Sequence, residues 1–167
     1  FVVESAGRIW LIPDVTAASP TKVLFLNITD RVVSDSFERG AKGVACHPGF
    51  LTNGFIFVTY DYTSNSVVRT RVSRFTRSTL NPQQADPASE VVLINQVLDG
   101  PYHDVDSCRF GPDGYLYVSF GDEGLQNEDY QNAQRIDKDL YTTIIRIDVD
   151  KRPGNLDARK SPSDHDE

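Results

Sequence analysis

The sequence predicts an all-β protein made of short antiparallel strands joined by tight turns. Apolar and polar residues alternate in several segments, as in Tyr115 to Phe120, and this period of two is typical of strands. Turn-forming residues separate the segments, as in Pro112-Asp113-Gly114. No segment has a convincing helical period, although residues 127–140 could form one short turn of helix.

An internal repeat indicates how these strands are organised. The segment G-V-A-C-H-P-G-F, followed by N-G-F-I-F-V-T-Y, parallels S-C-R-F-G-P-D-G-Y-L-Y-V-S-F, and Pro48 and Pro112 are 64 residues apart. Repeats of about 40–60 residues with four short strands are typical of β-propeller blades. Val44 to Ile94 is therefore predicted to be one blade, with neighbouring blades before and after it. Since a propeller closes with at least about four blades and about three are predicted here, we expect the remainder of the propeller, or another chain, to complete the ring.

Each strand is expected between recognisable turn signals. Asn53-Gly54 predicts a hairpin turn, and Thr76 to Ser89, which contains two prolines, predicts a loop. Residues 1–150 are predicted to form the blades and residues 151–167 a charged loop or disordered tail. The expected strands are Phe1–Glu4, Arg8–Ile12, Val23–Leu26, Gly43–Cys46, Phe55–Tyr60, Val67–Phe75, Glu90–Ile94, one ending near Phe110, Tyr115–Phe120 and Tyr141–Val149.

Composition excludes some partners. The 167 residues carry a formal charge of −7, which argues against a nucleic-acid partner, and no apolar run approaches the roughly 20 residues that span a membrane.

The chain has no Met and opens in a strand-like segment, so we expect a mature, processed or truncated product. Asn27-Ile28-Thr29 matches the glycosylation pattern and favours a secreted protein, extracellular or periplasmic. Cys46 and Cys108 are interpreted as two isolated buried thiols, with a single disulfide as the alternative.

Three motifs resemble the soluble quinoprotein glucose/sorbosone dehydrogenase family, which includes hedgehog-interacting-protein-like ectodomains. The first motif is G-V-A-C-H-P-G-F with N-G-F-I-F-V-T-Y, the second is F-G-P-D-G-Y-L-Y-V-S-F-G-D, and the third ends in L-Y-T-T-I-I-R-I-D-V-D. They occur in the family's order between Phe1 and about Asp150. The resemblance implies the front portion of a six-bladed propeller.

The resemblance also implies a chemistry. Such enzymes hold pyrroloquinoline quinone (PQQ) with Ca²⁺ over the propeller axis and oxidise a sugar hydroxyl, with a histidine as base and the quinone as hydride acceptor. His103 occupies the position of that histidine, and imidazole suits the role because its pKa is near ambient pH. Glu38 falls at the position of a glutamine that contacts the quinone.

The chain departs from the family pattern at three places. Ser107 replaces an arginine, Glu38 replaces the glutamine, and Thr142-Thr143 replace Gly-Lys. A carboxylate at position 38 would repel the carboxylates of the quinone unless a cation lay between them. These departures favour the alternative function, a non-catalytic extracellular propeller that binds protein or carbohydrate or acts as a structural module. A calcium-dependent hydrolase on a similar propeller is a third hypothesis.

Several side chains have both a functional and a structural interpretation. Asp104 and Asp106 beside His103 could hold a cation, and Asp122 and Glu123, with Glu128 and Asp129, are oxygen ligands of the kind Ca²⁺ prefers; the structural alternative is solvated turn carboxylates. His47 is interpreted as a structural residue that fixes a turn. The remaining groups are a solvated strand face (Arg69, Arg71, Arg74) and aromatic packing positions (Phe55, Phe57, Tyr60, Tyr115, Tyr117, Phe120).

Overall fold

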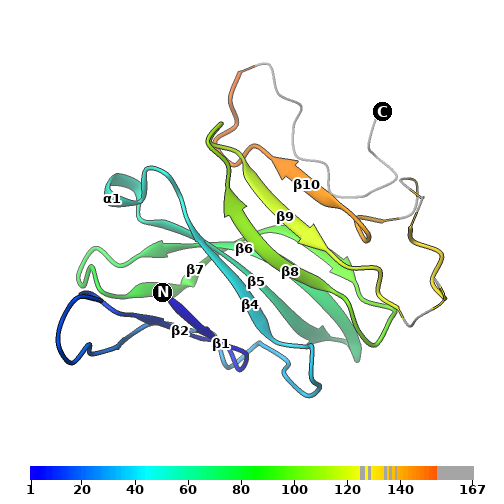
Figure 1. Ribbon diagram of the computed structural model, residues 1–167, viewed down its shortest axis with the longest axis horizontal. Coiled ribbons are helices and arrows are strands. Elements are labelled where there is room, and N and C mark those ends of the chain that lie inside the picture. Colours follow the sequence, from blue (N-terminus) through cyan, green and yellow to red (C-terminus); the bar gives the residue numbers. More distant parts are fainter. Residues whose placement is uncertain (125–126, 128, 134, 136, 138, 154–167) are drawn as a thin grey trace.

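The computed structural model describes residues 1–124, 127, 129–133, 135, 137 and 139–153. Three antiparallel sheets lie side by side, and within each sheet neighbouring strands are consecutive in the chain (Figure 1). Their strands are β1 (Val2–Glu4), β2 (Arg8–Leu11) and β3 (Val23–Asn27) in the first sheet, β4 (Ala41–Cys46), β5 (Phe55–Ser64), β6 (Val67–Arg77) and β7 (Ala85–Val97) in the second, and β8 (Val105–Phe110), β9 (Leu116–Phe120) and β10 (Ile144–Ile147) in the third.

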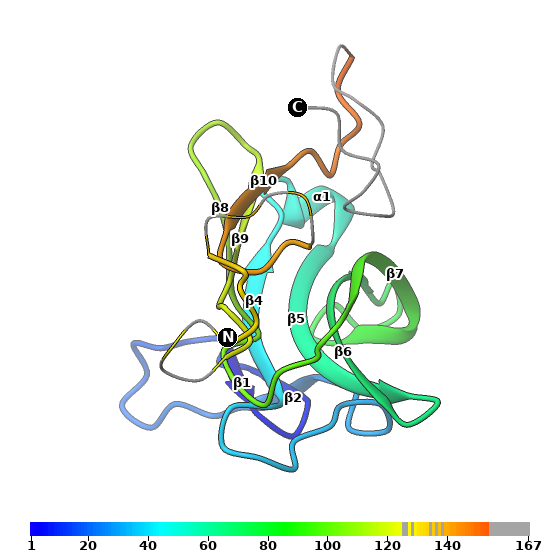
Figure 2. The same ribbon diagram turned by 90° about the vertical axis from the view of Figure 1, so that its right-hand side faces the viewer.

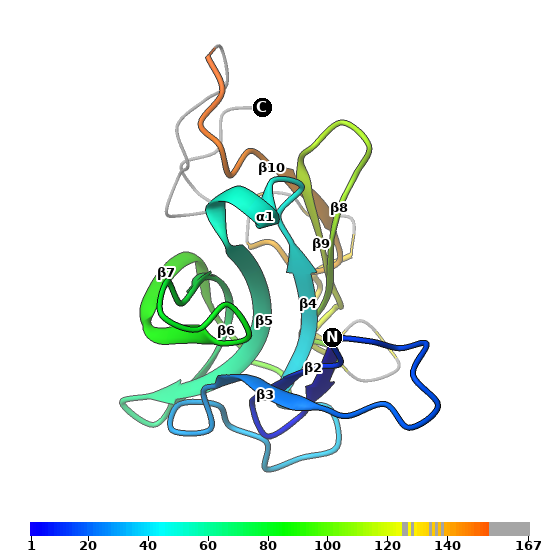
Figure 3. The same cartoon turned by 90° about the vertical axis from the view of Figure 1, so that its left-hand side faces the viewer.

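The sheets meet through their first strands, as blades do around a propeller axis. Strand β4 contacts β1 on one side and β8 on the other, while β3 contacts β7 at the far edge of the first interface. In Figures 2 and 3 the second sheet runs outward from β4, which stands beside β8 and β9, to β7. The prediction of an all-β, partial propeller is confirmed, and Val44 to Ile94 falls within one four-stranded sheet as expected.

Strand β5 is buried on both faces, because it belongs to the middle sheet. Even-numbered residues such as Ile56 and Val58 pack in a core with the first sheet, whereas Phe57 packs in a second core with the third sheet. This two-sided burial explains the nearly unbroken apolar run in this part of the sequence. It also leaves Thr59 and Asp61, on the same face as Phe57, fully buried at the second interface.

Glycine lets two sheets approach closely at that interface. A Cβ atom on Gly43 would lie 2.9 Å from the backbone oxygen of Asp106 and 3.0 Å from the nitrogen of Cys108, too close for any side chain. The Thr59 hydroxyl donates a 2.6 Å hydrogen bond to the same Asp106 oxygen. The first strands of the second and third sheets are therefore joined almost backbone to backbone.

Three local predictions were wrong. Asn53-Gly54 does not form a two-residue hairpin turn: Phe50–Asn53 form the short helix α1, and Gly54 caps it with a φ of 68° in the left-handed region. Strand β7 begins at Ala85, inside the predicted loop. Pro87 fits there because β7 is the outermost strand of its sheet and its register shifts next to Asp86, so no ladder hydrogen bond is lost.

The third wrong prediction concerns the arginines of β6, which do not form a solvated face. The side chain of Arg71 is only 20% exposed, and its guanidinium lies 3.6 Å from the centre of the Tyr62 ring. Arg74 lies over Phe55 in the same way, at 4.2 Å. Stacking on aromatic faces buries the long aliphatic stems of these side chains and keeps each guanidinium charge in contact with an aromatic ring.

Other predictions fall partly outside the described residues. Within residues 127–140 the described positions contain no helix, and residues 154–167 of the predicted tail are not described. Among the residues that the structure does describe, no helix has the length and apolar character needed to cross a bilayer.

A partly buried ionic network joins the first two sheets. The carboxylate of Glu90 on β7 accepts hydrogen bonds from Arg31 (2.7 Å), Ser73 (2.7 Å) and the hydroxyl of Tyr60. Burial by itself raises the pKa of Glu90, but these hydrogen bonds outweigh burial and hold the pKa below its ordinary value of 4.5. Burial and the Glu90 contact raise the pKa of Tyr60 to about 12.

We predict that Glu90→Gln lowers the free energy of unfolding by about 2 kcal/mol near pH 7, because hydrogen bonds to a charged group are lost. The carboxylate contribution is complete above pH 4.5 and disappears as the pH falls through the lower folded-state pKa. Urea unfolding of both proteins at several pH values should show the difference shrinking in acid. Glu4→Gln is the control: this half-exposed ion pair with Arg8 is worth at most about 0.5 kcal/mol. A difference that stays constant down to pH 3 would contradict the assignment.

Candidate functional site

The β8–β9 hairpin places His103 and Asp122 at the same end of the third sheet. Val105 pairs with Phe120 in the register of these strands, so the residues two positions further out, His103 and Asp122, lie opposite each other. The turn at the other end closes through a hydrogen bond from the Gly114 nitrogen to the Gly111 oxygen, with Gly114 at a φ of 79°. The sequence thus brings a loop histidine and a loop carboxylate together through an ordinary hairpin.

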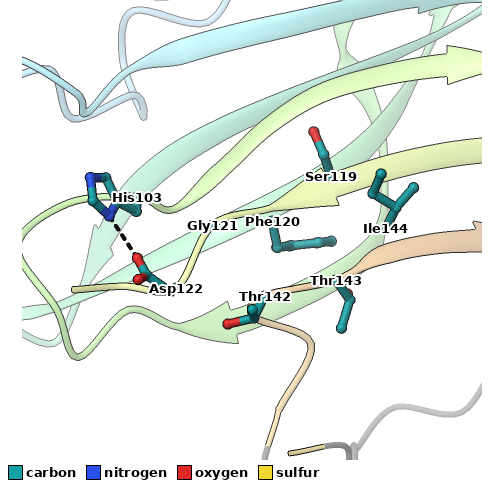
Figure 4. A pocket seen from close by; sticks show the side chains of 8 residues that line it. All are labelled: His103, Ser119, Phe120, Gly121, Asp122, Thr142, Thr143 and Ile144. Atoms are coloured by element: carbon teal, nitrogen blue, oxygen red, sulfur yellow. Dashed lines mark hydrogen bonds and ion pairs between the residues drawn. The ribbon is translucent and has the colours of Figure 1, made fainter. Parts of the chain in front are cut away.

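The two side chains form a hydrogen-bonded pair. His103 Nδ1 lies 2.6 Å from Asp122 Oδ1 (Figure 4). Burial opposes ionisation of Asp122, but hydrogen bonds from His103 and from the Gly124 nitrogen outweigh it and keep the pKa of the Asp122 carboxyl below its usual value. An ionised carboxylate can only accept, so Nδ1 of His103 carries the proton and donates it. In the neutral ring, Nε2 is left with a free lone pair.

Glu38, from the loop ahead of β4, reaches His103 from the neighbouring sheet. Its Oε2 atom accepts a 2.7 Å hydrogen bond from the His103 backbone nitrogen, and its Oε1 atom lies 3.9 Å from Nε2 of the same residue. The second distance is too long for a hydrogen bond. The His103 side chain is 48% exposed.

The backbone of His103 is held in an uncommon conformation. Its φ is 52°, in the left-handed region, and its carbonyl oxygen accepts a hydrogen bond from the Glu123 nitrogen at 3.1 Å. Gly121 packs directly against it: a Cβ on Gly121 would lie 2.4 Å from the His103 oxygen and 2.6 Å from its Cβ. The ring position therefore depends on the absence of a side chain at residue 121.

An open depression of about 420 Å³ lies beside this pair. Figure 4 shows His103 and Asp122 at one end of it, with side chains from β9, from β10 and from the segment between them along its floor. It is lined by His103, Ser119, Phe120, Gly121, Asp122, Thr142, Thr143 and Ile144. These described residues include no lysine or arginine.

Thr142 has a strained backbone in this lining. Its φ is 61°, which a β-branched residue rarely adopts, while its nitrogen donates a 2.7 Å hydrogen bond to the Gly121 oxygen. Glycine adopts this conformation at no steric cost. The glycine that the family resemblance implies at this position therefore matches the observed backbone, and the chain keeps the same geometry with threonine.

His47 contrasts with His103. Nδ1 of His47 accepts a hydrogen bond from the Gly49 nitrogen at 2.9 Å and lies 2.8 Å from the Asn53 amide, while Nε2 lies 2.9 Å from Asp150. Both ring nitrogens are occupied, and the contacts of Nδ1 with Gly49 and Asn53 hold the turn before α1. This supports the structural interpretation of His47.

The predicted metal ligands do not converge. Asp104 contacts Lys42, Asp106 is exposed, and the buried Glu123 accepts hydrogen bonds from the Asp99 nitrogen (2.8 Å) and the Asn132 amide (2.7 Å). Glu128 is outside the described residues. Among the residues that are described, no group of three or more His, Cys, Asp or Glu side chains is arranged to hold a metal ion. A calcium site therefore remains a prediction.

Both cysteines are free thiols. Cys108 is buried against β5, where its sulfur lies 3.7 Å from the Phe57 oxygen, and burial raises its pKa to about 12. Cys46 is half-buried, and burial raises its pKa as well. The interpretation as isolated thiols agrees with the structure.

Comparison with known proteins shows which family shares this architecture. The family model for glucose/sorbosone dehydrogenases matches residues 1–160. The chain belongs to this family. The HIPL2 protein of Arabidopsis thaliana is 30% identical over 96% of the chain, and human hedgehog-interacting protein is 31% identical over 68% of it. The chain spans 29% and 17% of the length of these two proteins.

Solved structures share the fold. The PQQ-bound aldose sugar dehydrogenase of Streptomyces coelicolor superposes with a TM-score of 0.65 and 23% identity, covering 92% of the chain and 42% of that structure. A putative oxidoreductase (glucose dehydrogenase) of Thermus thermophilus gives a TM-score of 0.69 and 23% identity, over 96% of the chain and 45% of that structure. The three sheets therefore resemble part of the propeller of sugar dehydrogenases.

The described residues around His103 do not by themselves fit an anionic quinone. Glu38 and Asp122 are both carboxylates, and the depression is lined by no positive side chain among the described residues. The nearby ammonium of Lys42 is occupied by Asp61 and Asp104. Binding of PQQ carboxylates here would require a positive charge that these residues do not supply.

The sequence predicts Asp122 near His103 but as a metal ligand, whereas the structure makes it the hydrogen-bond partner of His103. Its position opposite His103 in the hairpin register is the signal for that partner. Lys42 is not identified from the sequence, because it adjoins a small-residue strand and its partners are distant in the chain. A lysine directly ahead of the predicted strand Gly43–Cys46 is the signal that could have identified it.

We predict that Gly121→Ala displaces His103, since the new methyl group would overlap the His103 backbone. The expected loss of stability is about 1–3 kcal/mol, as for other overpacked sites. The bond between His103 and Asp122 should also break, which imidazole NMR signals would report. Gly49→Ala is the control, because Gly49 has a φ of −90° and a Cβ there would lie no closer than 3.3 Å to its neighbours. An unchanged His103 signal in Gly121→Ala would show that the close approach is unimportant.

We predict that Thr142→Gly stabilises the protein by up to about 1 kcal/mol, because relief of left-handed strain exceeds the entropy cost of glycine. Thr143→Gly should instead destabilise it, since the Thr143 hydroxyl donates a 2.6 Å hydrogen bond to the Leu140 oxygen. Chemical unfolding of the two variants measures both effects. Destabilisation of similar size in both variants would refute the strain at residue 142.

Proposed function

We propose that the full-length protein oxidises a sugar hydroxyl, as a PQQ-dependent dehydrogenase of its family, and that His103 is the proton acceptor. The observation that supports this proposal is the His103–Asp122 pair, which fixes the proton on Nδ1 and leaves Nε2 as the nitrogen that can accept one. Membership of the glucose/sorbosone dehydrogenase family favours an aldose or a related sugar as substrate.

Asp122 would act as the positioning residue for this base. A carboxylate hydrogen-bonded to one imidazole nitrogen holds the ring in a single tautomer and stabilises the positive charge when the other nitrogen takes up a proton. A positioned base of this kind contributes about 10²–10⁴-fold to the rate. The open depression beside this pair would hold a hydroxyl-bearing ligand next to His103.

The electron acceptor is proposed from family resemblance alone. PQQ supplies hydride acceptance when it is bound, and the S. coelicolor relative was solved in its PQQ-bound form. Because Glu38 and Asp122 make this side of the site acidic, the proposal requires a compensating cation, for which Ca²⁺ is the candidate, or basic residues from the remainder of the propeller. We propose a secreted location, extracellular or periplasmic.

The second candidate function is a non-catalytic binding propeller. The specific observations that favour it are Glu38 in contact with His103, Ser107, Thr142-Thr143, and the similarity to hedgehog-interacting protein. In this case the acidic side of the site, formed by Glu38 and Asp122, would contact a protein or carbohydrate partner, and no redox chemistry would occur.

Dye reduction by the full-length protein with PQQ, Ca²⁺ and a panel of aldoses separates the two functions. We expect turnover, and we expect His103→Ala to lower kcat about 10²–10⁴-fold without loss of quinone absorbance. Asp122→Asn should lower kcat as well, because an amide no longer fixes the tautomer. His47→Gln is the histidine control: it should reduce stability but leave the rate of the folded enzyme unchanged. The absence of both quinone absorbance and turnover would favour the binding propeller.

A further inference from the structure

A buried cluster of three charged residues lies next to the site, between the second and third sheets. The ammonium of Lys42 on β4 contacts the carboxylate of Asp104, which directly follows His103 in the chain, and lies 3.2 Å from Asp61 Oδ2 on β5. The Lys42 side chain is 17% exposed, whereas those of Asp61 and Asp104 are 0% and 1% exposed. One ammonium therefore serves two carboxylates that are hidden from water.

Such a cluster is costly to bury. Burial raises the pKa of Asp61 and lowers the pKa of Lys42, so the environment opposes charge on both groups. Asp61 Oδ1 and Asp104 Oδ2 are buried with no hydrogen-bond partner among the described residues. Buried ion pairs are weak sources of stability, and apolar side chains of similar volume often replace them without loss. A cluster of this kind is better explained by the geometry that it imposes.

That geometry connects the two loops that form the site. Asp61 Oδ2 accepts a 3.1 Å hydrogen bond from the nitrogen of Gly40, two residues after Glu38. Asp104 is the residue next to His103, and its backbone oxygen accepts a hydrogen bond from the Gly121 nitrogen at 2.9 Å. The Lys42 ammonium is thus the common partner of both loops, one from each sheet.

We propose that Lys42, acting through Asp104 and Asp61, is a positioning residue that holds His103 in register with Glu38 and Asp122. The backbone of His103 has a φ of 52°, an uncommon conformation that persists only when its surroundings determine it. On one side it is fixed by the Glu38 carboxylate, and on the other by Asp104. This inference rests on the proposed function for its catalytic consequence, but not for its structural one.

The test uses two variants of the full-length protein. Asp104→Asn removes one charge, and the triple variant Lys42→Met/Asp61→Asn/Asp104→Asn removes all three charges at similar volume, which keeps a folded protein available if single substitutions unfold it. The first readout is the two-bond ¹H–¹⁵N spectrum of the imidazoles, with the His103 signal assigned from His103→Gln. The second is kcat and KM for aldose oxidation.

We expect both variants to lose the single Nδ1–H tautomer signature of His103 while remaining folded. We also expect kcat to fall about 10²-fold with little change in KM, as for a displacement of about 1 Å of a reacting group. A triple variant that retains both the tautomer signature and kcat would overturn the proposal.

Glu90→Gln is the matched control. It breaks a partly buried ionic network at the other sheet interface, so it should reduce stability without changing the His103 signal or kcat. If it changed them equally, general loosening of the sheets would explain the effect and the proposal would fail. The NMR readout needs no substrate: if the protein oxidises no sugar, the proposed function fails, whereas the His103 signal still decides whether Lys42 positions the ring.

Discussion

The structure depends on the burial of β5 between two other sheets. One face of this strand packs against the first sheet and the other against the third, so the middle sheet has no solvated face along most of β5. The hydrophobic effect is largest where apolar area is removed from water on both sides. Because the cores lie between sheets rather than within one sheet, each sheet depends on its neighbour for stability.

The candidate site follows from that packing. The first strands of the second and third sheets lie close enough for a single threonine hydroxyl to bridge them, and the loops that precede these strands therefore meet. Glu38 and His103 occupy equivalent places in the two sheets, each ahead of the first strand. Their contact is a consequence of two repeats placed side by side, and Asp122 joins them through the hairpin.

The sequence was sufficient for features set by short-range patterns. The alternation in Leu116–Phe120, the turn at Gly114 and the meeting of His103 with Asp122 all follow from one hairpin. Long-range contacts could not be read in this way. The partners of Lys42 are 19 and 62 residues away in the chain, as the positions 61 and 104 show, and no local pattern specifies them.

Failures of local prediction have the same origin. Asn53-Gly54 is a strong hairpin signal, but the connection from β4 to β5 is longer than two residues, and the glycine instead ends a helical turn. Pro87 suggests a loop, yet an outermost strand with a shifted register accommodates it. In each case the position of the residue in the sheet outweighed its intrinsic preference.

The depth of Cys108 has a further consequence for how the molecule moves. Its sulfur is sealed between β8 and β5, and a thiol with a pKa of about 12 is almost never a thiolate at neutral pH. An alkylating reagent can react with it only after these two strands have separated and water has entered. The rate at which the Cys108 sulfur is labelled therefore reports how often the interface that supports His103 opens.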